Sequence, residues 1–420
     1  MRSMNQKTQS DLSFIYHFTG NPFVDGGIAA LCALSGKDAP QEITKEDLKR
    51  SSEFIVKIYP KWQKLRYLFT QNCLLLHPAI RNRAERYEKY VNNLVHKISN
   101  ASTSGDCAIC GMRSSVDLVL RHEHPLTGSG DLTNYFSFFE SGLPLCPACI
   151  FALHLIPLYL VSNDGTLFLA HSHNQKFMLD LAKGAVTYVR TMDATGQTIS
   201  YYTPFAFKKN EKYEFLVKLV HKLVSEADSP FGRVSVRLYS FINSGQLNFL
   251  SFLDLPTNVF VFIEKAIQGG FKKNLDYFLK ELSPKVYQAL VEEKNLMYFF
   301  LQQKERKLIG GWGLFALYLV EVEKMDKERL EVLKKMGKNL YEYLKSDNFK
   351  KLKDLEAIDK YGNFRLFLTK AQKEQLIWEI EDEQFLFPQD KEGAIRWKET
   401  HLVLLAYIYE QLHKENRKVN

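Results

Sequence analysis

The sequence predicts an α+β protein in which a mixed N-terminal region carries an inserted four-cysteine zinc module and is followed by an all-α C-terminal helical bundle. Three observations support this fold class: two Cys-x-x-Cys pairs, strand-like segments through the middle third, and long Leu-, Tyr-, Lys- and Glu-rich helical patterns after about residue 271. The 420 residues are enough for several domains. We expect a mostly helical region (1–100), the zinc-knuckle module with a β-hairpin (101–175), a mixed α/β segment (176–270) and the bundle (271–420).

The N-terminal region predicts three helices. Residues 21–27 (NPFVDGG) supply turn and N-cap residues in front of the apolar run 28–34, which we expect to be a buried helix. Thr44 and Asp47 have the spacing of a capping box and should begin the second helix. A third helix is expected over residues 77–99, where an apolar stripe lies opposite arginine and lysine side chains.

Two cysteine pairs, Cys107/Cys110 (CAIC) and Cys146/Cys149 (CPAC), have the pattern of a structural zinc site. Each pair can direct two thiolates at one centre, and four thiolates complete the tetrahedron that zinc prefers in closed sites. Residues 111–145 separate the pairs, which is longer than the about 15 to 20 residues common in such sites. We therefore expect a sizeable excursion between them. Two disulfides are the alternative, but 6 Cys in 420 residues is far from a disulfide-rich composition.

The middle third predicts β-structure, and the C-terminal third predicts helices. Apolar segments flank an Asn-Asp-Gly turn at 163–165, which is a hairpin pattern. Strand-like sequence patterns recur at 198–207 and 233–242. Helical patterns over 275–290 and 326–344, separated by Pro and Gly, predict the bundle.

Composition limits the classes of protein that are compatible with this chain. Hydrophobic residues at 45% and charged residues at 25% are ordinary for a globular protein. No run reaches the roughly 20 apolar residues of a membrane helix, and the polar N-terminus lacks a signal core, so we expect a cytoplasmic protein. A net charge of +8 favours contact with a polyanion. Cys32 and Cys73 lie in apolar runs and should be small buried hydrophobes.

One alternative places catalysis in the cysteine module. Nucleases of the HNH class resemble its layout, with His122 or His124 as general base, Asn134 as orienting residue and His154 as metal ligand. The Asp-His pair usual in that class is replaced by Arg-His or Glu-His, and His154 lies in an apolar run. His171 and His173 end a predicted strand and can also bind a metal, although we expect them at a solvent-exposed hairpin end.

The segments FTGNPFVDGGIAAL, CAIC with CPAC, and RLYSFINSGQ before LPTNVFVFIEKA together resemble one family. This is the large subunit of type I-B CRISPR Cascade complexes, the CXXC-CXXC type of CRISPR-associated protein. The resemblance implies a non-enzymatic subunit that binds near the crRNA 5′ end, reads a PAM in target double-stranded DNA and helps to open the duplex. Its implied partners are crRNA, target double-stranded DNA and the backbone, crRNA-end-binding and small subunits of Cascade, and the complex either recruits a helicase-nuclease or serves a transposon.

The resemblance also implies that the four cysteines hold a structural zinc ion and that small polar side chains contact nucleic acid. Asn243, Ser244 and Gln246, in a loop directly after a predicted strand, are the first candidates, and Asn21 is the next. A simple turn is the alternative account of the first three. The bundle resembles the separate Cascade small subunit, for which Met297 and Met325 are candidate internal starts. A zinc-stabilised protein-interaction module without a nucleic-acid role is a third hypothesis.

Overall fold

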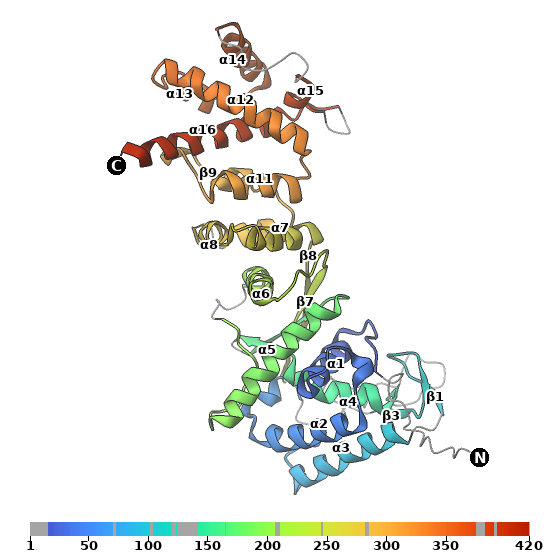
Figure 1. Ribbon diagram of the computed structural model, residues 1–420. Coiled ribbons are helices and arrows are strands. Elements are labelled where there is room, and N and C mark those ends of the chain that lie inside the picture. The colour runs from blue at the N-terminus through green and yellow to red at the C-terminus, as the bar shows by residue number, and fades with distance from the viewer. Residues whose placement is uncertain are drawn as a thin grey trace, which may run out of the picture. The chain divides into compact units, whose positions relative to one another are not determined.

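The computed structural model describes residues 16–69, 73–100, 104–119, 123, 142–163, 165–205, 211–244, 247–281, 285–374, 383–389 and 393–419. The chain divides into two compact units. Unit 1 comprises the residues up to Leu219 together with Glu226–Leu255, and unit 2 comprises Val220–Ser225 and the residues from Pro256 onward. Helices and antiparallel sheets occur together, which confirms the predicted α+β class (Figure 1).

Unit 1 contains helices α1 to α5, most of α6 and strands β1 to β8. Their bounds are α1 Pro22–Ser35, α2 Lys45–Ile58, α3 Arg83–Ser99, β1 Gly105–Asp106, β2 Arg113–Ser114, β3 Asp117–Val119, β4 Leu143–Leu145, α4 Pro147–Leu155, β5 Val161–Asn163, β6 Thr166–His171, α5 Gln175–Ala194, α6 Lys212–Glu226, β7 Val236–Ser244 and β8 Leu247–Leu255. The predicted segments 1–100, 101–175 and 176–270 thus share this unit up to Leu255.

Helix α1 is central to the core of unit 1, where it packs against α2, α4 and α5 (Figure 1). Gly26 and Gly27, expected in a turn, instead lie inside this helix. A Cβ atom on Gly27 would lie 1.8 Å from the carbonyl oxygen of Ala152 in α4. The two glycines therefore permit close helix–helix contact, and the turn prediction for them was wrong. Cys32 and Cys73 are buried, as predicted.

The other two N-terminal helices follow the sequence pattern closely. Thr44 and Asp47 form a complete capping box at the start of α2. Helix α3 begins at Arg83 rather than at residue 77, because Asn82 adopts a left-handed conformation with φ of 53°. Its buried side chains are Tyr87, Val91, Leu94 and Ile98.

A four-stranded antiparallel sheet in the order β5-β6-β7-β8 completes unit 1. The predicted hairpin is confirmed as β5 and β6, and the predicted strand at 233–242 is confirmed as β7. The segment before the hairpin is helix α4 and a 3-10 turn rather than a strand. The strand predicted at 198–207 does not form in its described part, where Tyr202 makes only an isolated bridge to Val161.

In its described residues, unit 2 consists of helices and one short β-hairpin. Its elements are α7 Thr257–Gln268, α8 Lys272–Glu281, α9 Lys285–Val291, α10 Met297–Phe300, β9 Leu301–Gln302, β10 Lys307–Leu308, α11 Gly311–Glu321, α12 Lys327–Ser346, α13 Leu352–Glu356, α14 Tyr361–Glu374, α15 Glu383–Leu386 and α16 Trp397–Val419. Helix α12 packs on α16, and α11 packs on α7 and α8. The predicted helices at 275–290 and 326–344 correspond to α8 with α9 and to α12.

Unit 2 has a buried core of its own. The Phe300 ring stacks on Phe278 with ring centroids 4.0 Å apart, and Arg329 of α12 forms an ion pair of 2.8 Å with Glu399 of α16. Over the described residues of both units, none of the helices combines the length and the apolar character needed to cross a membrane.

Candidate metal centre

The first cysteine pair lies on a tight turn closed by the β1–β2 hairpin. The amide of Cys107 donates to the carbonyl of Met112 (3.1 Å), and the amide of Gly111 donates back to the carbonyl of Cys107 (2.9 Å). Gly111 has a φ of 67°, a left-handed conformation that glycine adopts without steric cost. Cys107 and Cys110 are therefore presented on one face of a short loop.

The second pair lies at the N-terminus of α4. Cys146 is the N-cap residue, and its sulfur accepts a hydrogen bond from the amide of Cys149 at 3.4 Å. Pro147 at the first helical position has no N–H to satisfy and has a φ suited to the helix. The positive end of the helix dipole favours negatively charged sulfur at this position.

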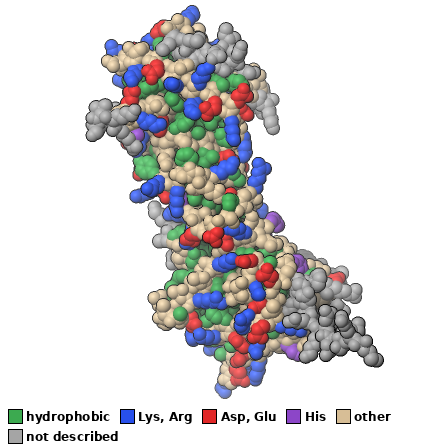
Figure 2. Space-filling view, viewed as in Figure 1, with side chains coloured by type: hydrophobic (Ala, Val, Ile, Leu, Met, Phe, Trp, Pro, Cys, Tyr) green, Lys and Arg blue, Asp and Glu red, His purple; other side chains and the backbone are tan. Residues whose placement is uncertain are grey.

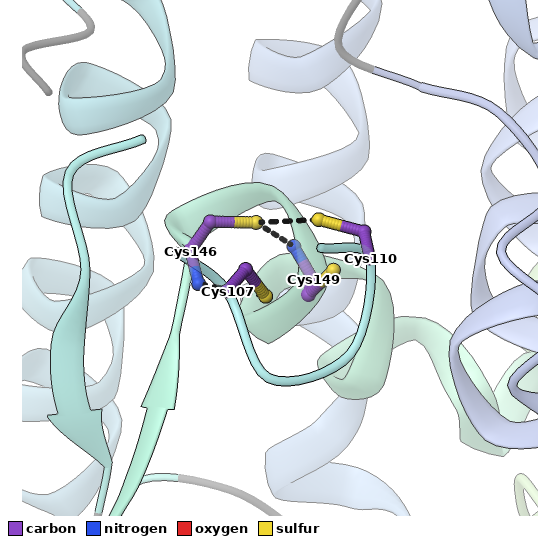
Figure 3. Close-up of side chains that lie close together, drawn as sticks. All are labelled: Cys107, Cys110, Cys146 and Cys149. Carbon is purple, nitrogen blue, oxygen red and sulfur yellow. Dashed lines mark hydrogen bonds between the residues drawn. The ribbon is translucent and has the colours of Figure 1, made fainter. Parts of the chain in front are cut away.

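The β3–β4 ladder and two cross-links bring the pairs together. The amide of Ala108 donates to the carbonyl of Pro144 at 2.8 Å, and the amide of Cys146 donates to the Cys107 sulfur at 3.3 Å. All four sulfurs lie within 4.8 Å of one another and point toward one centre (Figure 3). Cys110 is partly exposed, and the other three cysteines are buried.

The separation of the sulfurs fits a shared metal ion. The Cys110 and Cys146 sulfurs are 3.8 Å apart. A disulfide bond is about 2.05 Å long, whereas Zn–S bonds of about 2.3 Å in a tetrahedron place neighbouring sulfurs about 3.8 Å apart. Four thiols in this arrangement can hold a metal ion such as zinc. In the described part of the chain, no other group of three or more His, Cys, Asp or Glu side chains is placed to do so.

The electrostatics of the cluster also favour a cation. The pKa of the Cys107 thiol is lowered because its sulfur accepts hydrogen bonds, first from Cys110 and then from Cys146 and Cys149. The pKa of Cys149 is raised because it shares hydrogen bonds, first with Cys107 and then with Cys110 and Cys146, and because it is buried. Without a cation, the ionised Cys107 sulfur thus favours the protonated forms of Cys146 and Cys149, whose pKa values are both raised. A divalent ion compensates the charge of several thiolates at once.

His154, the metal ligand of the nuclease hypothesis, is engaged elsewhere. Its Nε2 lies 2.6 Å from the backbone oxygen of Glu123, and its Nδ1 lies 3.1 Å from the hydroxyl of Tyr87. Nε2 is therefore the donor, and Nδ1 accepts from the tyrosine. The Tyr90 hydroxyl donates to the same Glu123 oxygen at 3.0 Å. His154 is a packed histidine that contacts Tyr87 and Glu123, and neither ring nitrogen is available for a metal.

Three other members of the nuclease hypothesis, His122, His124 and Asn134, lie outside the described residues. His171, expected at an exposed hairpin end, is instead buried, with its Nε2 at 3.0 Å from Oδ2 of Asp25. His173 is exposed, as expected.

Asp25 is a buried polar residue that the sequence did not single out for this role. Its carboxylate also accepts from the amides of Thr19 (2.6 Å) and Gly20 (3.0 Å). A carboxylate that receives this many hydrogen bonds orders the chain in front of α1. The only local feature that could have indicated this role is the position of Asp25 shortly before the apolar run 28–34 of α1.

The residues predicted to contact nucleic acid occupy two neighbouring places in unit 1. Asn21 is the N-cap of α1, and its Oδ1 accepts from the amides of Phe23 (3.1 Å) and Val24 (3.2 Å). The Phe23 ring packs 5.5 Å from that of Phe241 in β7, so the start of α1 lies beside β7.

Two of the other candidates lie at the end of β7. Asn243 and Ser244 are the last residues of β7 and pair with Asn248 and Leu247 of β8. The prediction that they follow the strand was therefore wrong. Gln246 lies outside the described residues.

Comparison with known proteins gives a match centred on the four cysteines. Residues 100–161 match the model of a family described as CRISPR-associated protein (Cas_CXXC_CXXC). Comparisons with curated proteins and with solved structures gave no match. The segment that forms the candidate metal centre is thus similar to that of CRISPR-associated proteins of the CXXC-CXXC type.

Proposed function

We propose that this chain is the non-catalytic large subunit of a type I-B CRISPR Cascade complex. In this role it contributes to PAM recognition, crRNA 5′-end binding and target duplex opening in antiviral defence. The observation that carries the proposal is the family match over residues 100–161, which covers all four clustered cysteines. Guide pairing then supplies sequence specificity, and the protein reads the PAM and the shape of the nucleic acid.

Zinc is proposed as a structural ion in this subunit. Four cysteine ligands fill a tetrahedral site and leave no position for water or substrate. The ion would join the strands β1 to β4 to the N-terminus of α4, and α4 is buried against α1 and α3. This arrangement supports a scaffolding role for the metal centre.

Basic side chains on and beside α3 are candidates for phosphate contacts. Arg81, Arg83 and Arg86 are exposed, and Lys89 pairs with Glu85 at 2.7 Å. Exposed arginines and lysines can neutralise backbone phosphates and release counterions. On the face shown in Figure 2, Lys, Arg, Asp and Glu side chains are interspersed.

Base contacts are proposed for the segment at and after the end of β7, with Asn243, Ser244 and Gln246 as candidates. Such a segment can enter a groove, where amide and hydroxyl groups hydrogen-bond to base edges. Asn21 is a weaker candidate, because its side-chain oxygen already caps α1.

Internal translation of the bundle is a further part of the proposal. A product that begins at Met297 would lack α7 and α8, which pack on α11, and one that begins at Met325 would lack α11 as well. We expect the longer product to be the more stable of the two. Detection of only the full-length chain after expression of the gene would contradict internal translation.

The decisive experiment uses the chain purified with its neighbouring gene products and a crRNA. A labelled duplex with a matched protospacer and a library of flanking sequences is added in the presence of magnesium. We expect a shift that requires both guide and flank, without cleavage by the complex lacking a helicase-nuclease. Guide-independent cleavage that is lost in His122→Ala or His124→Ala would replace this proposal with the nuclease. Absence of both binding and cleavage would favour a protein-interaction module.

A further inference from the structure

A small pocket lies in unit 1 where the C-terminal end of α1 meets α2 and α5. It has a volume of about 210 Å³ and is lined by Leu34 and Ser35 of α1, by Arg50, Ser51 and Phe54 of α2, and by Arg190 of α5. Pockets for drug-sized molecules usually exceed about 300 Å³. The pocket therefore suits a small group rather than a whole nucleotide.

Arg190 brings an unpaired positive charge to this pocket. Its Nη2 donates to the carbonyl of Leu34 at 2.8 Å, and its guanidinium lies 5.8 Å from the centre of the Phe54 ring. Among the described residues it forms no ion pair. The nearest carboxylate along α5, Asp193, is already shared by Lys57 (2.7 Å) and Lys61 (3.6 Å). Most of the five donors of Arg190 remain free for a ligand.

Arg50 supplies the second guanidinium. One of its nitrogens, Nη2, binds Oδ1 of Asp47 at 2.6 Å, while the other carboxylate oxygen accepts from the amide of Thr44 (3.0 Å). Asp47 is thus used in capping α2 and in orienting Arg50. The side chain of Arg50 is 64% exposed, so its remaining donors can reach a ligand from solvent.

Two serine hydroxyls complete the set of donors. The Oγ of Ser35 is buried without a hydrogen-bond partner in the described structure, which is an unfavourable state for a hydroxyl. Ser51 is 3% exposed and lines the same pocket. A ligand that offers several acceptor oxygens would satisfy these groups.

The C-terminal end of a helix normally repels anions, because its last carbonyls are unpaired. Here the carbonyl of Leu34 accepts from Arg190, that of Ala33 from the amide of Gly36, and that of Cys32 from the amide of Lys37. Most of the negative end of α1 is therefore neutralised. The pocket combines two cations and two hydroxyls with no carboxylate among its lining residues.

We propose that this pocket binds a phosphate group of a nucleic-acid backbone. Guanidinium groups match the geometry of phosphate oxygens with paired hydrogen bonds and remain charged at all physiological pH values. Phe54 supplies an apolar wall for the adjoining sugar. The nucleic-acid source rests on the proposed function, whereas phosphate recognition rests on the pocket alone.

The first test titrates inorganic phosphate into the full-length chain by calorimetry. Wild type should bind one phosphate at the pocket. Arg50→Gln and Arg190→Gln should each weaken binding by roughly tenfold or more. Ser35→Ala should weaken it less, and Arg233→Gln, which makes the same charge change at an exposed position outside the pocket, should leave it unchanged. Equal affinity in all variants, or no saturable binding, would overturn the proposal.

Thermal unfolding of the same variants separates binding from folding. If Arg190→Gln lowers the melting temperature but leaves phosphate affinity intact, Arg190 only caps α1 and the proposal fails. Ser35→Ala keeps the proposal testable if an arginine variant does not fold.

A second arm identifies the source of the phosphate with a single-stranded oligonucleotide. Each pocket variant should reduce the salt slope of oligonucleotide binding by about one phosphate contact. An unchanged slope in a variant that has lost phosphate binding would exclude nucleic acid as the source. Neither arm needs a guide or partner subunits. A chain that binds phosphate but fails guide-dependent duplex binding would therefore contradict the proposed function and not the pocket.

Discussion

Substitution of Gly27 by alanine sets two physical effects of opposite sign against each other. Gly27 lies inside α1, where helix propensity alone favours alanine by up to about 1 kcal/mol. The new methyl group, however, would lie 1.8 Å from the carbonyl oxygen of Ala152 and 2.5 Å from its carbonyl carbon. Carbon atoms pack best at about 3.5 to 4.0 Å, so α1 and α4 would have to move apart.

The size of the effect follows from what the methyl group meets. Ala152 is fully buried, and the clash is with its backbone, so no side-chain rotation can relieve it. Overpacking typically costs about 1–3 kcal/mol, and a backbone clash belongs at or above the upper end. We therefore expect Gly27→Ala to lower the free energy of unfolding by at least about 2 kcal/mol after the gain in propensity.

Two matched glycines provide controls. Gly26→Ala would meet side-chain atoms and no backbone atom, with Cδ1 of Ile156 at 2.6 Å and Cδ1 of Tyr159 at 2.9 Å, and should cost less than Gly27→Ala. Gly362→Ala in α14 meets nothing within 4 Å and should be neutral or slightly stabilising.

Urea unfolding followed by circular dichroism measures the stability of the three variants. Hydrogen exchange of peptides from α1 and α4 locates the change. A Gly27→Ala protein as stable as wild type, with unchanged protection in both helices, would refute the close α1–α4 contact.

Three further predictions concern the metal, the α1 cap and pH. Wild type should bind one zinc ion per chain, measured by mass spectrometry of the metal, and Cys110→Ser should lose it. Cys73 is a buried cysteine outside the cluster, so Cys73→Ala should retain the zinc ion. Asn21→Ala should lower the free energy of unfolding of unit 1 by about 1 kcal/mol in urea unfolding, whereas Asn21→Asp should not, because aspartate also caps helices. If a stable Asn21→Asp protein recognises a different PAM, the Asn21 side chain also contacts bases. Burial lowers the pKa of His401 below its usual 6.5, so its neutral form is favoured in the folded state. The contribution of His401 to the free energy of unfolding should be full above about pH 6.5 and decline as the pH falls toward the folded-state pKa. His401→Gln should therefore show a flatter dependence of the unfolding midpoint on pH.

Local chemistry explains why some elements could be predicted from the sequence. The capping box of Thr44 and Asp47 acts within one turn of helix, and the structure contains both of its hydrogen bonds. The two cysteine pairs are far apart in sequence, yet they could be assigned to one site because few residue types can serve as zinc ligands and their spacing is restricted by the metal geometry.

Contacts between distant segments explain the failures. Gly26 and Gly27 look like turn residues, and only the approach of α4 shows that they are needed for packing. The segment at 198–207 has an apolar pattern because Ile199 and Tyr201 are buried by packing, without a strand ladder. The pairing of Asp25 with His171 joins residues far apart in sequence, and neither residue predicts the other.

The β3–β4 ladder determines where this protein can accept additional chain. Val119 and Leu143 are paired directly, so the chain leaves and re-enters this ladder at positions that are held by backbone hydrogen bonds and not by the metal. Each doubling of the length of a flexible connection between two such fixed ends costs only about 0.6 kcal/mol in closure entropy. The excursion can therefore change in length between related proteins, or receive an inserted peptide or fluorescent label, while the four sulfurs keep their positions.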